Sequence, residues 1–160
     1  MRISVLAVGR LKSGGESDLA ERYAKRFEQS GRALGLGPLR QIEVNESRHA
    51  EVAARRDDEA SRLIARCHVK ARRVVLDERG KAVTSEEFAQ TLGTLRDDGV
   101  AEAVFLIGGA DGHGRAVFEG AHARLSLGPM TLPHGLARVV LLEQLYRAVT
   151  ILSGHPYHRP

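Results

Sequence analysis

Hydrophobic positions along the chain follow two different spacings. Short apolar runs bounded by glycine, proline or charged residues predict buried strands, and apolar residues spaced three or four apart predict helices. The short runs predict strands at residues 2–8, 39–44, 73–76, 103–107 and 124–127. The helical spacing predicts helices at residues 16–29, 51–67, 114–121 and 136–152, with one more helix between the third and fourth strands.

That additional helix has a clear start signal. Thr84 and Glu87 have the spacing of a capping box, in which each side chain bonds the other residue's backbone N–H. Phe88, Leu92 and Leu95 then recur at helical spacing on one side. The sequence therefore predicts a helix that begins just after Thr84.

Strands that alternate with helices predict an α/β fold with a largely parallel sheet covered by helices on both faces. The chain of 160 residues has the length of one ordinary domain. Residues 31–38 (GRALGLGP) are rich in turn formers, but neither side of them could bury a core alone. We therefore expect a single domain over residues 1–160, without internal repeats.

The last predicted helix is apolar around most of its circumference. Its apolar positions are Leu136, Val139, Val140, Leu141, Leu142, Leu145, Val149, Ile151 and Leu152. A helix of this kind is buried on more than one side. We expect one side to face the sheet and another to face a second copy of the chain, so that Leu145→Asp would place a charge on an apolar face. A fully internal helix is the alternative.

Composition narrows the class of protein only a little. The 24 Lys and Arg residues exceed the 20 Asp and Glu residues by a net +4, which is compatible with RNA binding without establishing it. Cys67 is the single cysteine, so no internal disulfide is possible and a reducing compartment is expected. No apolar run reaches the length of a membrane span, and the first residues lack signal-peptide features. We therefore expect a cytoplasmic protein.

Several common catalytic motifs are missing. The glycine-rich stretch at residues 108–114 does not have the GxGxxG spacing of a dinucleotide site, and no P-loop or GxSxG motif exists. His155 and His158 have an HxxH spacing, and His68 follows Cys67, but a second thiolate is absent. Because metal sites need three or four convergent ligands, we expect no metal.

What remains is a set of residues at the ends of predicted strands. Ligands of open α/β sheets bind at the carboxyl ends of the strands, and Leu76, Gly108 and Leu127 each stand at such an end. The glycines of residues 108–114 allow close approach to a ligand, although a simple tight turn is the alternative. The proline-containing segment 127–134 is irregular, so its backbone can offer N–H and C=O groups to a ligand. His134 is best interpreted as a polar residue at a helix start.

The last residues, 154–160, crowd polar side chains into a short tail. Tyr157 could stack on a base, His158 could exchange a proton near neutral pH, and Arg159 could hold a phosphate. A solvated tail is the alternative.

Taken together, the sequence motifs resemble one family. They are Leu-Ala-Val-Gly at 6–9, Leu-Asp at 76–77, Leu-Ile-Gly-Gly at 106–109 with Gly112, Leu-Ser at 125–126, Met-Thr-Leu-Pro-His at 130–134, Arg-Val-Val-Leu-Leu-Glu-Gln-Leu-Tyr-Arg-Ala at 138–148 and His-Pro-Tyr-His-Arg at 155–159. This set is similar to that of the ribosomal RNA large subunit methyltransferase H family. The resemblance spans the chain and is densest toward its C-terminus.

The resemblance implies a SPOUT-type α/β fold with a C-terminal trefoil knot, acting as a homodimer. It implies S-adenosylmethionine as methyl donor and N3 of a pseudouridine in 23S rRNA, within the assembled ribosome, as acceptor; neither DNA nor a membrane is a partner. Carried over by position, the cofactor residues are Leu76, Gly108, Leu127, Gly128, Pro129, Met130, Thr131 and Leu132. The catalytic residues are Tyr157, His158 and Arg159. Gly128-Pro129 stands at positions that vary in the family, and Pro160 extends its usual ending.

Chemistry and geometry add two expectations. Methyl transfer needs donor and acceptor in line at about 3–3.5 Å, with His158 or a water accepting the N3 proton and Arg159 stabilising the anion. A helix of about 17 residues is about 25 Å long, so the tail is expected to reach the partner's donor pocket instead of its own. Two other functions stay open: a non-enzymatic ribosome-binding factor of the same fold, and a flavodoxin-like nucleotide sensor. Only the methyltransferase should bind S-adenosylmethionine.

Overall fold

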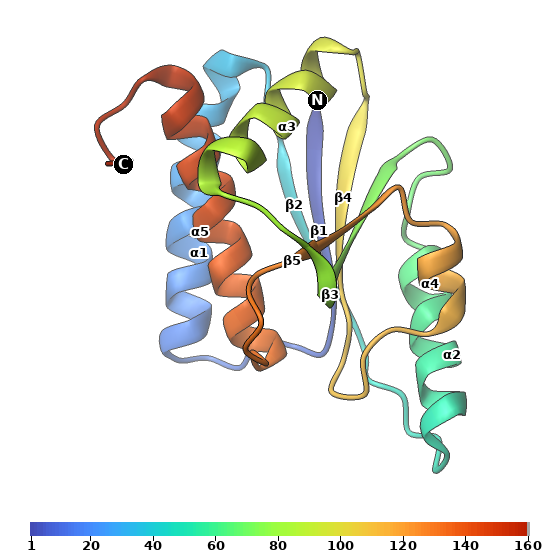
Figure 1. The fold of residues 1–160 in the computed structure, drawn as a ribbon. Helices are drawn as coiled ribbons and strands as arrows, with labels where there is room; N and C mark the ends of the chain where they lie inside the picture. Colours follow the sequence, from blue (N-terminus) through green and yellow to red (C-terminus); the bar gives the residue numbers. More distant parts are fainter. Residues whose placement is uncertain (160) are drawn as a thin grey trace.

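The computed structural model describes residues 1–159 (Figure 1). Pro160, which the sequence suggested as an extension of the family's usual ending, lies outside the described residues. The elements in chain order are β1 (Arg2–Val8), α1 (Gly15–Gly31), η1 (Arg32–Leu34), β2 (Leu39–Val44), α2 (Val52–Ile64), β3 (Arg72–Ala82), α3 (Ser85–Asp97), β4 (Glu102–Ile107), α4 (Arg115–Glu119), β5 (Ala123–Ser126) and α5 (His134–Ser153).

The strands form one parallel five-stranded sheet in the order β2-β1-β4-β3-β5. Strands β1 and β4 lie inside the sheet, and each is buried along nearly its whole length. This confirms the predicted α/β class. Because every strand runs in the same direction, their carboxyl ends meet at one edge of the sheet.

Helices cover both faces of the sheet, as Figure 1 shows. On β1, Ile3, Val5 and Ala7 point into a core shared with α1, α3 and α5, whereas Leu6 and Val8 point into a second core shared with α2 and α4. The alternation follows from the strand period of two. The capping box at Thr84 and Glu87 is present, and α3 begins where the sequence predicted.

Helix α5 is covered by its own chain on more sides than the sequence suggested. It packs mainly against α1 and α3, and Leu145 is fully buried in that core. Leu145→Asp would therefore disrupt the interior of one copy, which makes it a poor test of an interface. The exposed large apolar residue on this helix is Leu136, which is 40% exposed.

Strand β3 is longer than predicted, reaching Ala82 where the apolar run had ended at Leu76. After Leu76 the chain pairs with β5 again, so that both Leu76 and Lys81 stand opposite Leu125. Gly80 lies so close to β5 that a Cβ there would be 2.8 Å from the backbone carbonyl carbon of Leu125. Residues 77–82 are mainly polar, so the apolar pattern could not predict that β3 continues through them. The order of strands in the sheet does not show whether the chain passes through a loop of itself, so the trefoil knot stays a prediction.

Candidate functional site

The carboxyl ends of β4 and β5 and the middle of β3 line a cavity of about 920 Å³. Leu76, Gly108 and Leu127, which the sequence placed at strand ends, line it together. Gly108 and Leu127 directly follow β4 and β5, but Leu76 lies inside β3, where the pairing with β5 shifts register, so its placement at a strand end was wrong. So do four more of the predicted cofactor residues: Gly128, Met130, Thr131 and Leu132. Pro129 is the one predicted cofactor residue that does not line the cavity. Segments from three distant parts of the chain thus converge on one site.

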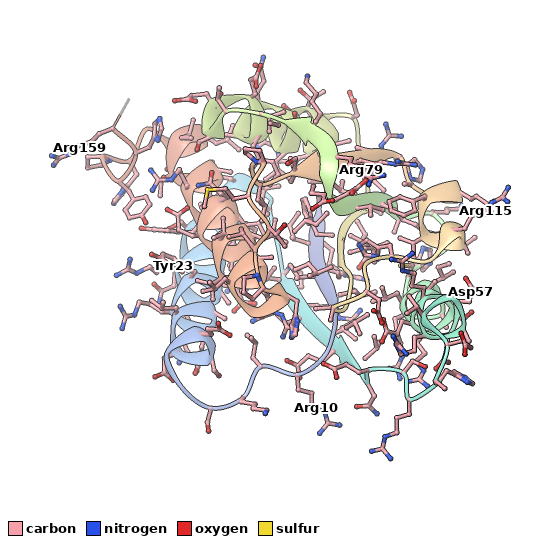
Figure 2. All side chains as sticks on the ribbon, turned by 60° about the horizontal axis from the view of Figure 1, so that its bottom comes forward. Arg10, Tyr23, Asp57, Arg79, Arg115 and Arg159 are labelled. Atoms are coloured by element: carbon pink, nitrogen blue, oxygen red, sulfur yellow. The ribbon has the colours of Figure 1, made fainter. Side chains whose placement is uncertain are left out.

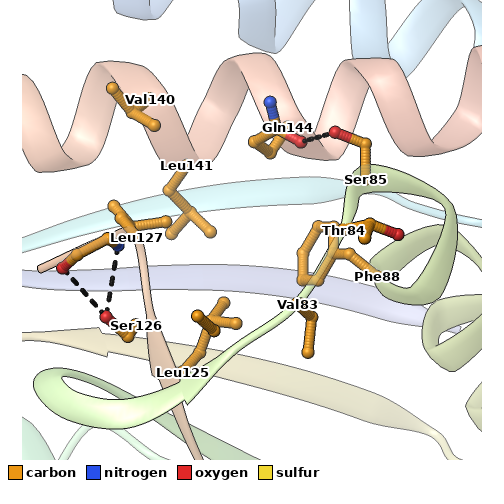
Figure 3. A pocket seen from close by; sticks show the side chains of 12 residues that line it. Val83, Thr84, Ser85, Phe88, Leu125, Ser126, Leu127, Val140, Leu141 and Gln144 are labelled. Carbon is orange, nitrogen blue, oxygen red and sulfur yellow. Dashed lines mark hydrogen bonds between the residues drawn. The ribbon is translucent and has the colours of Figure 1, made fainter. Parts of the chain in front are cut away.

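A second cavity of about 260 Å³ is lined in part by the segment 125–128 (Figure 3). Leu125, Leu127 and Gly128 line both cavities and form the wall between them. The Ser126 hydroxyl fixes this wall, because it accepts from the Gly128 N–H at 3.2 Å and donates to the Gly128 carbonyl at 3.0 Å. The remaining lining residues are Ala82, Val83, Thr84, Ser85, Phe88, Ser126, Val140, Leu141 and Gln144.

Sequence reasoning missed the smaller cavity. Its residues come from the connection between β3 and α3 and from the middle of α5, and each of those segments was explained as cap or core. Ser85 donates a hydrogen bond to the Gln144 side chain at 2.8 Å across the cavity (Figure 3). Ser85 and Gln144 are far apart in sequence, so no motif spacing could have indicated that they meet.

The glycine-rich segment after β4 is both a tight turn and a cavity wall. The Gly112 N–H donates to the Gly109 carbonyl at 3.0 Å, and Gly112 has a φ of +83° that favours glycine. A Cβ on Gly108 would lie 3.1 Å from the Gly112 carbonyl carbon. The loop is therefore both a tight turn and a lining segment of the cavity, the two interpretations that the sequence left open.

His113, which the sequence did not single out, sits at the base of the larger cavity. Its Nε2 lies 3.2 Å from the Leu76 carbonyl, and its ring packs edge-on against Phe118 at 5.7 Å between centroids. Burial lowers the pKa of His113, with hydrogen bonding to the Leu76 carbonyl opposing the effect. His113 is therefore neutral at physiological pH and ties the loop after β4 to Leu76 in the middle of β3.

The rim of the larger cavity carries several arginines. Arg56, Arg79 and Arg124 line it together with Asp77 and Asp111. The Arg124 guanidinium lies 4.3 Å from the Phe118 ring centroid and 3.8 Å from the Asp77 carboxylate. Arg79 extends into solvent (Figure 2). Such a rim can contact the phosphates of a nucleic acid while the interior holds a smaller ligand.

Tyr157 in the tail is packed against its own chain. Its hydroxyl donates to Glu143 Oε1 at 3.0 Å, its ring lies 4.6 Å from that of Tyr146, and Arg147 lies 4.9 Å from its centroid. Burial, followed by the bond to Glu143, raises the pKa of Tyr157 well above its ordinary value. In this position the ring has little free face on which a base could stack.

His158 is also paired, whereas Arg159 is exposed. His158 Nε2 lies 2.7 Å from Glu86 Oε1, and its Nδ1 lies 3.4 Å from an Arg147 nitrogen. Arg159 projects from the body of the molecule (Figure 2). Tyr157 and His158 are therefore held by contacts with their own chain, whereas Arg159 is exposed.

The tail and the larger cavity lie toward opposite ends of α5. His134 at the first turn lines the cavity, and the helix of 20 residues extends about 30 Å. The chain turns at Gly154, whose φ is +69°, and runs back as far as Glu143 and Glu86. Those residues are neighbours in sequence of Gln144 and Ser85, which line the smaller cavity. The contacts of the tail with Glu143 and Glu86 therefore bring it to the edge of the smaller cavity and not to the larger one.

Within residues 1–159, no group of three or more His, Cys, Asp or Glu side chains is placed to hold a metal ion. None of the helices in that range is long and apolar enough to cross a membrane.

Comparison with known proteins first gives the class. A family model described as predicted SPOUT methyltransferase matches residues 1–158. A parallel sheet with a cavity along three neighbouring strands is thus the framework of a methyltransferase of this class. A solved structure of a probable methylase family protein from Haemophilus influenzae Rd KW20 is more distant, with a TM-score of 0.49, 12% identity, and coverage of 99% of this chain and 70% of that chain.

Curated relatives then give the particular family. Proteins named ribosomal RNA large subunit methyltransferase H from Rhizobium meliloti and Agrobacterium fabrum are each 54% identical to this chain over 159 residues. The corresponding protein of Sinorhizobium fredii is 53% identical. In all three cases 99% of both sequences is covered. The chain belongs to the ribosomal RNA large subunit methyltransferase H family, which confirms the resemblance seen in its motifs.

Proposed function

We propose that this protein transfers a methyl group from S-adenosylmethionine to N3 of a pseudouridine in 23S rRNA, acting in the cytoplasm on the assembled ribosome. The relatives are named for methylating large-subunit ribosomal RNA, and they match over nearly the whole chain. The observation that carries the proposal is the convergence of Leu76, Gly108 and Leu127 on one large cavity.

The larger cavity fits the donor in size and chemistry. Its volume of about 920 Å³ is in the range of pockets that bind small molecules and cofactors. Leu127, Met130 and Leu132 offer apolar surface to a base, and the irregular backbone between β5 and α5 offers polar groups to ribose and methionine atoms. When bound, S-adenosylmethionine supplies a methyl group already activated by its sulfonium.

The chain's own residues must position the acceptor and take up its proton. His158 has Nε2 on Glu86 and Nδ1 beside Arg147, so neither nitrogen is free in this arrangement. Action as a base requires His158 to leave one of these partners when RNA binds. Arg159 is free to stabilise the N3 anion or to hold a neighbouring phosphate.

Binding of the donor is the first test. At 100 times its Kd, S-adenosylmethionine should stabilise the folded protein by about 2.7 kcal/mol. Titration calorimetry should show saturable binding that ATP and NAD do not displace. Saturable ATP binding without any heat from S-adenosylmethionine would favour a nucleotide sensor.

The substrate is the second test. A net charge of only +4 is small for selective capture of naked RNA, so the shape of the assembled ribosome should supply specificity. Assembled ribosomes should accept labelled methyl groups far faster than protein-free 23S rRNA. Equal labelling of both would contradict this part of the proposal.

We further propose a homodimer in which the exposed side of α5 contacts a second copy. Leu136 lies on that side, next to the cavity loop, whereas Leu145 is internal. Leu136→Asp should shift the protein toward monomers in sedimentation, because it introduces a charge into an apolar contact. The native protein should remain dimeric at micromolar concentration, and a native monomer there would rule the dimer out.

In this dimer each donor cavity would be completed by the partner's tail. The tail of one copy stops near the middle of its own α5, which leaves its own larger cavity without it. Gly108→Trp should block the donor and Arg159→Ala should remove the tail's charge. Either variant alone should be inactive, and verified heterodimers of the two should recover activity at one site. Inactive heterodimers would show that the tail serves its own chain or plays no part in catalysis.

A further inference from the structure

Helix α2, which supplies just one residue to the larger cavity, holds the glycine-rich loop that forms part of its wall. Asp111 stands at the tip of this loop. Arg55 donates from Nε to the Asp111 carboxylate at 2.7 Å, and Arg56 donates from Nε to the Asp111 carbonyl at 2.6 Å. Consecutive arginines thus bind the side chain and the backbone of the same residue.

Arg55 is itself anchored at its other end. Its terminal nitrogen donates to the carbonyls of His49 at 3.0 Å and Ala50 at 2.6 Å, just before α2 begins. The hydrogen bond from Arg55 lowers the pKa of Asp111, so the carboxylate stays charged at neutral pH. A planar guanidinium can bridge in this way because its donors are held in a fixed fork. The loop is therefore tied to a rigid helix start.

The base of the loop lies against α2 with no spare room. A Cβ on Gly109 would be 2.9 Å from Glu59 Oε2, and a Cβ on Gly114 would be 2.5 Å from the Arg56 carbonyl. Glu59 is buried, and its Oε1 accepts from the Ser47 N–H at 2.9 Å, which fixes the carboxylate in place. Helix α2 thus contacts the loop of residues 108–114 near both of its ends and at its tip, so the position of α2 sets the position of the loop.

We propose that Arg55 is a positioning residue for the donor site: through Asp111 it holds the loop of residues 108–114 in the conformation that receives S-adenosylmethionine. This inference rests on the proposed function. A loop with four glycines has many accessible conformations, and the tethered one places Gly108 on the cavity wall. Arg55 does not line the cavity, so it acts through the loop.

The effect on binding follows from the fraction of protein in the competent conformation. The apparent Kd equals the intrinsic Kd divided by that fraction. If Arg55→Ala leaves about a tenth of the loops in place, the apparent Kd rises about tenfold. The rate at saturating donor should change less than about twofold, since bound donor restores the loop. Arg55→Lys should fall between, because it keeps the charge without the fork.

Arg62→Ala is the matched control. Arg62 lies on the same helix and pairs with Asp58 at 2.6 Å, and it contacts the carbonyls of residues 45 and 46 instead of the loop. Loss of this pair should lower the unfolding temperature about as much as loss of the Arg55 pair. It should leave the Kd for S-adenosylmethionine unchanged.

The experiment measures three quantities on native, Arg55→Ala, Arg55→Lys and Arg62→Ala proteins: Kd by calorimetry, unfolding temperature, and amide exchange of residues 109–112. We expect weaker binding and faster loop exchange in Arg55→Ala alone, with partial recovery in Arg55→Lys. An Arg55→Ala protein with native Kd and native loop exchange would overturn the inference, as would an Arg62→Ala protein with the same loss of binding. A native protein without affinity for S-adenosylmethionine would instead overturn the proposed function.

Discussion

The two ends of helix α5 differ in how many of the nearby polar groups already have partners within the chain. At its start, His134 and the preceding irregular loop face a large cavity, and Met130 is 78% exposed. At its end, the tail folds back and pairs its polar groups with Glu143, Glu86 and Arg147. One end is open to a ligand, and the other is closed on its own chain.

This contrast suggests a division of work between the two ends. The cavity along β3, β4 and β5 is already open, so donor binding should need little rearrangement. A tail whose histidine and tyrosine already have partners must exchange those contacts for new ones when RNA arrives. Damage to the cavity should therefore remove binding, whereas damage to the tail should spare binding and remove transfer.

The largest expected effect is at the cavity. Gly108→Trp must displace the Gly112 backbone, which lies 3.1 Å from where a Cβ would stand, and S-adenosylmethionine binding should fall below detection by calorimetry. Gly15→Trp is the control, since nothing lies within 4 Å of a Cβ there. Retained binding in Gly108→Trp would remove this loop from the donor site.

Arg159→Ala should have the next largest effect. Methyl transfer to ribosomes should fall about a hundredfold or more, as it does when an enzyme loses a group that stabilises a developing anion. The Kd for S-adenosylmethionine should stay within about twofold of native, because the lost contact is to RNA. Arg40→Ala, on the exposed face of β2, is the control. Equal loss of binding and transfer in Arg159→Ala would contradict the division between the two ends.

Tyr157→Phe should have a moderate effect. It removes the hydroxyl that donates to Glu143 and keeps the ring against Tyr146, at a cost of about 1 kcal/mol. The tail then leaves its resting contacts more readily, so transfer should rise by up to about fivefold without change in donor affinity. Transfer rates and calorimetry measure the two quantities. Loss of donor binding in this variant would connect the tail directly to its own cavity.

The smallest effect is a pH dependence from His113. Burial holds its folded pKa below the ordinary value of 6.5, so the folded protein resists a proton that the unfolded chain accepts. Its stabilising contribution is complete above about pH 6.5 and declines as pH falls below it, by at most about 1.4 kcal/mol per pH unit. His113→Leu should show a shallower loss of stability between about pH 6.5 and 5 in denaturant titrations. Parallel curves for the two proteins would contradict a buried neutral His113.

Most of the fold could be predicted because burial sets the pattern. Strands β1 and β4 are buried on both faces, so they read as continuous apolar runs, and Thr84 with Glu87 marks the start of α3 through a specific spacing. The second pairing of β3 with β5 could not be predicted, because residues 77–82 are mainly polar and pair through their backbone.

The candidate site was predictable in its backbone and less so in its side chains. Strand ends converge in any parallel sheet, which placed Gly108 and Leu127 together, and Leu76 joins them from within β3. His113, the smaller cavity and the partners of the tail depend on contacts between residues far apart in sequence. Glu86 and His158 are an example, as are Ser85 and Gln144. No local pattern contains such pairs.

The most direct measurement is the mass of 23S rRNA fragments from cells with and without the gene for this protein, complemented by native or Arg159→Ala protein. The native protein should add one methyl group to a fragment that contains a pseudouridine, located at N3, and both the deletion and Arg159→Ala should lack it. Identical fragment masses in cells with and without the gene would contradict the proposed activity.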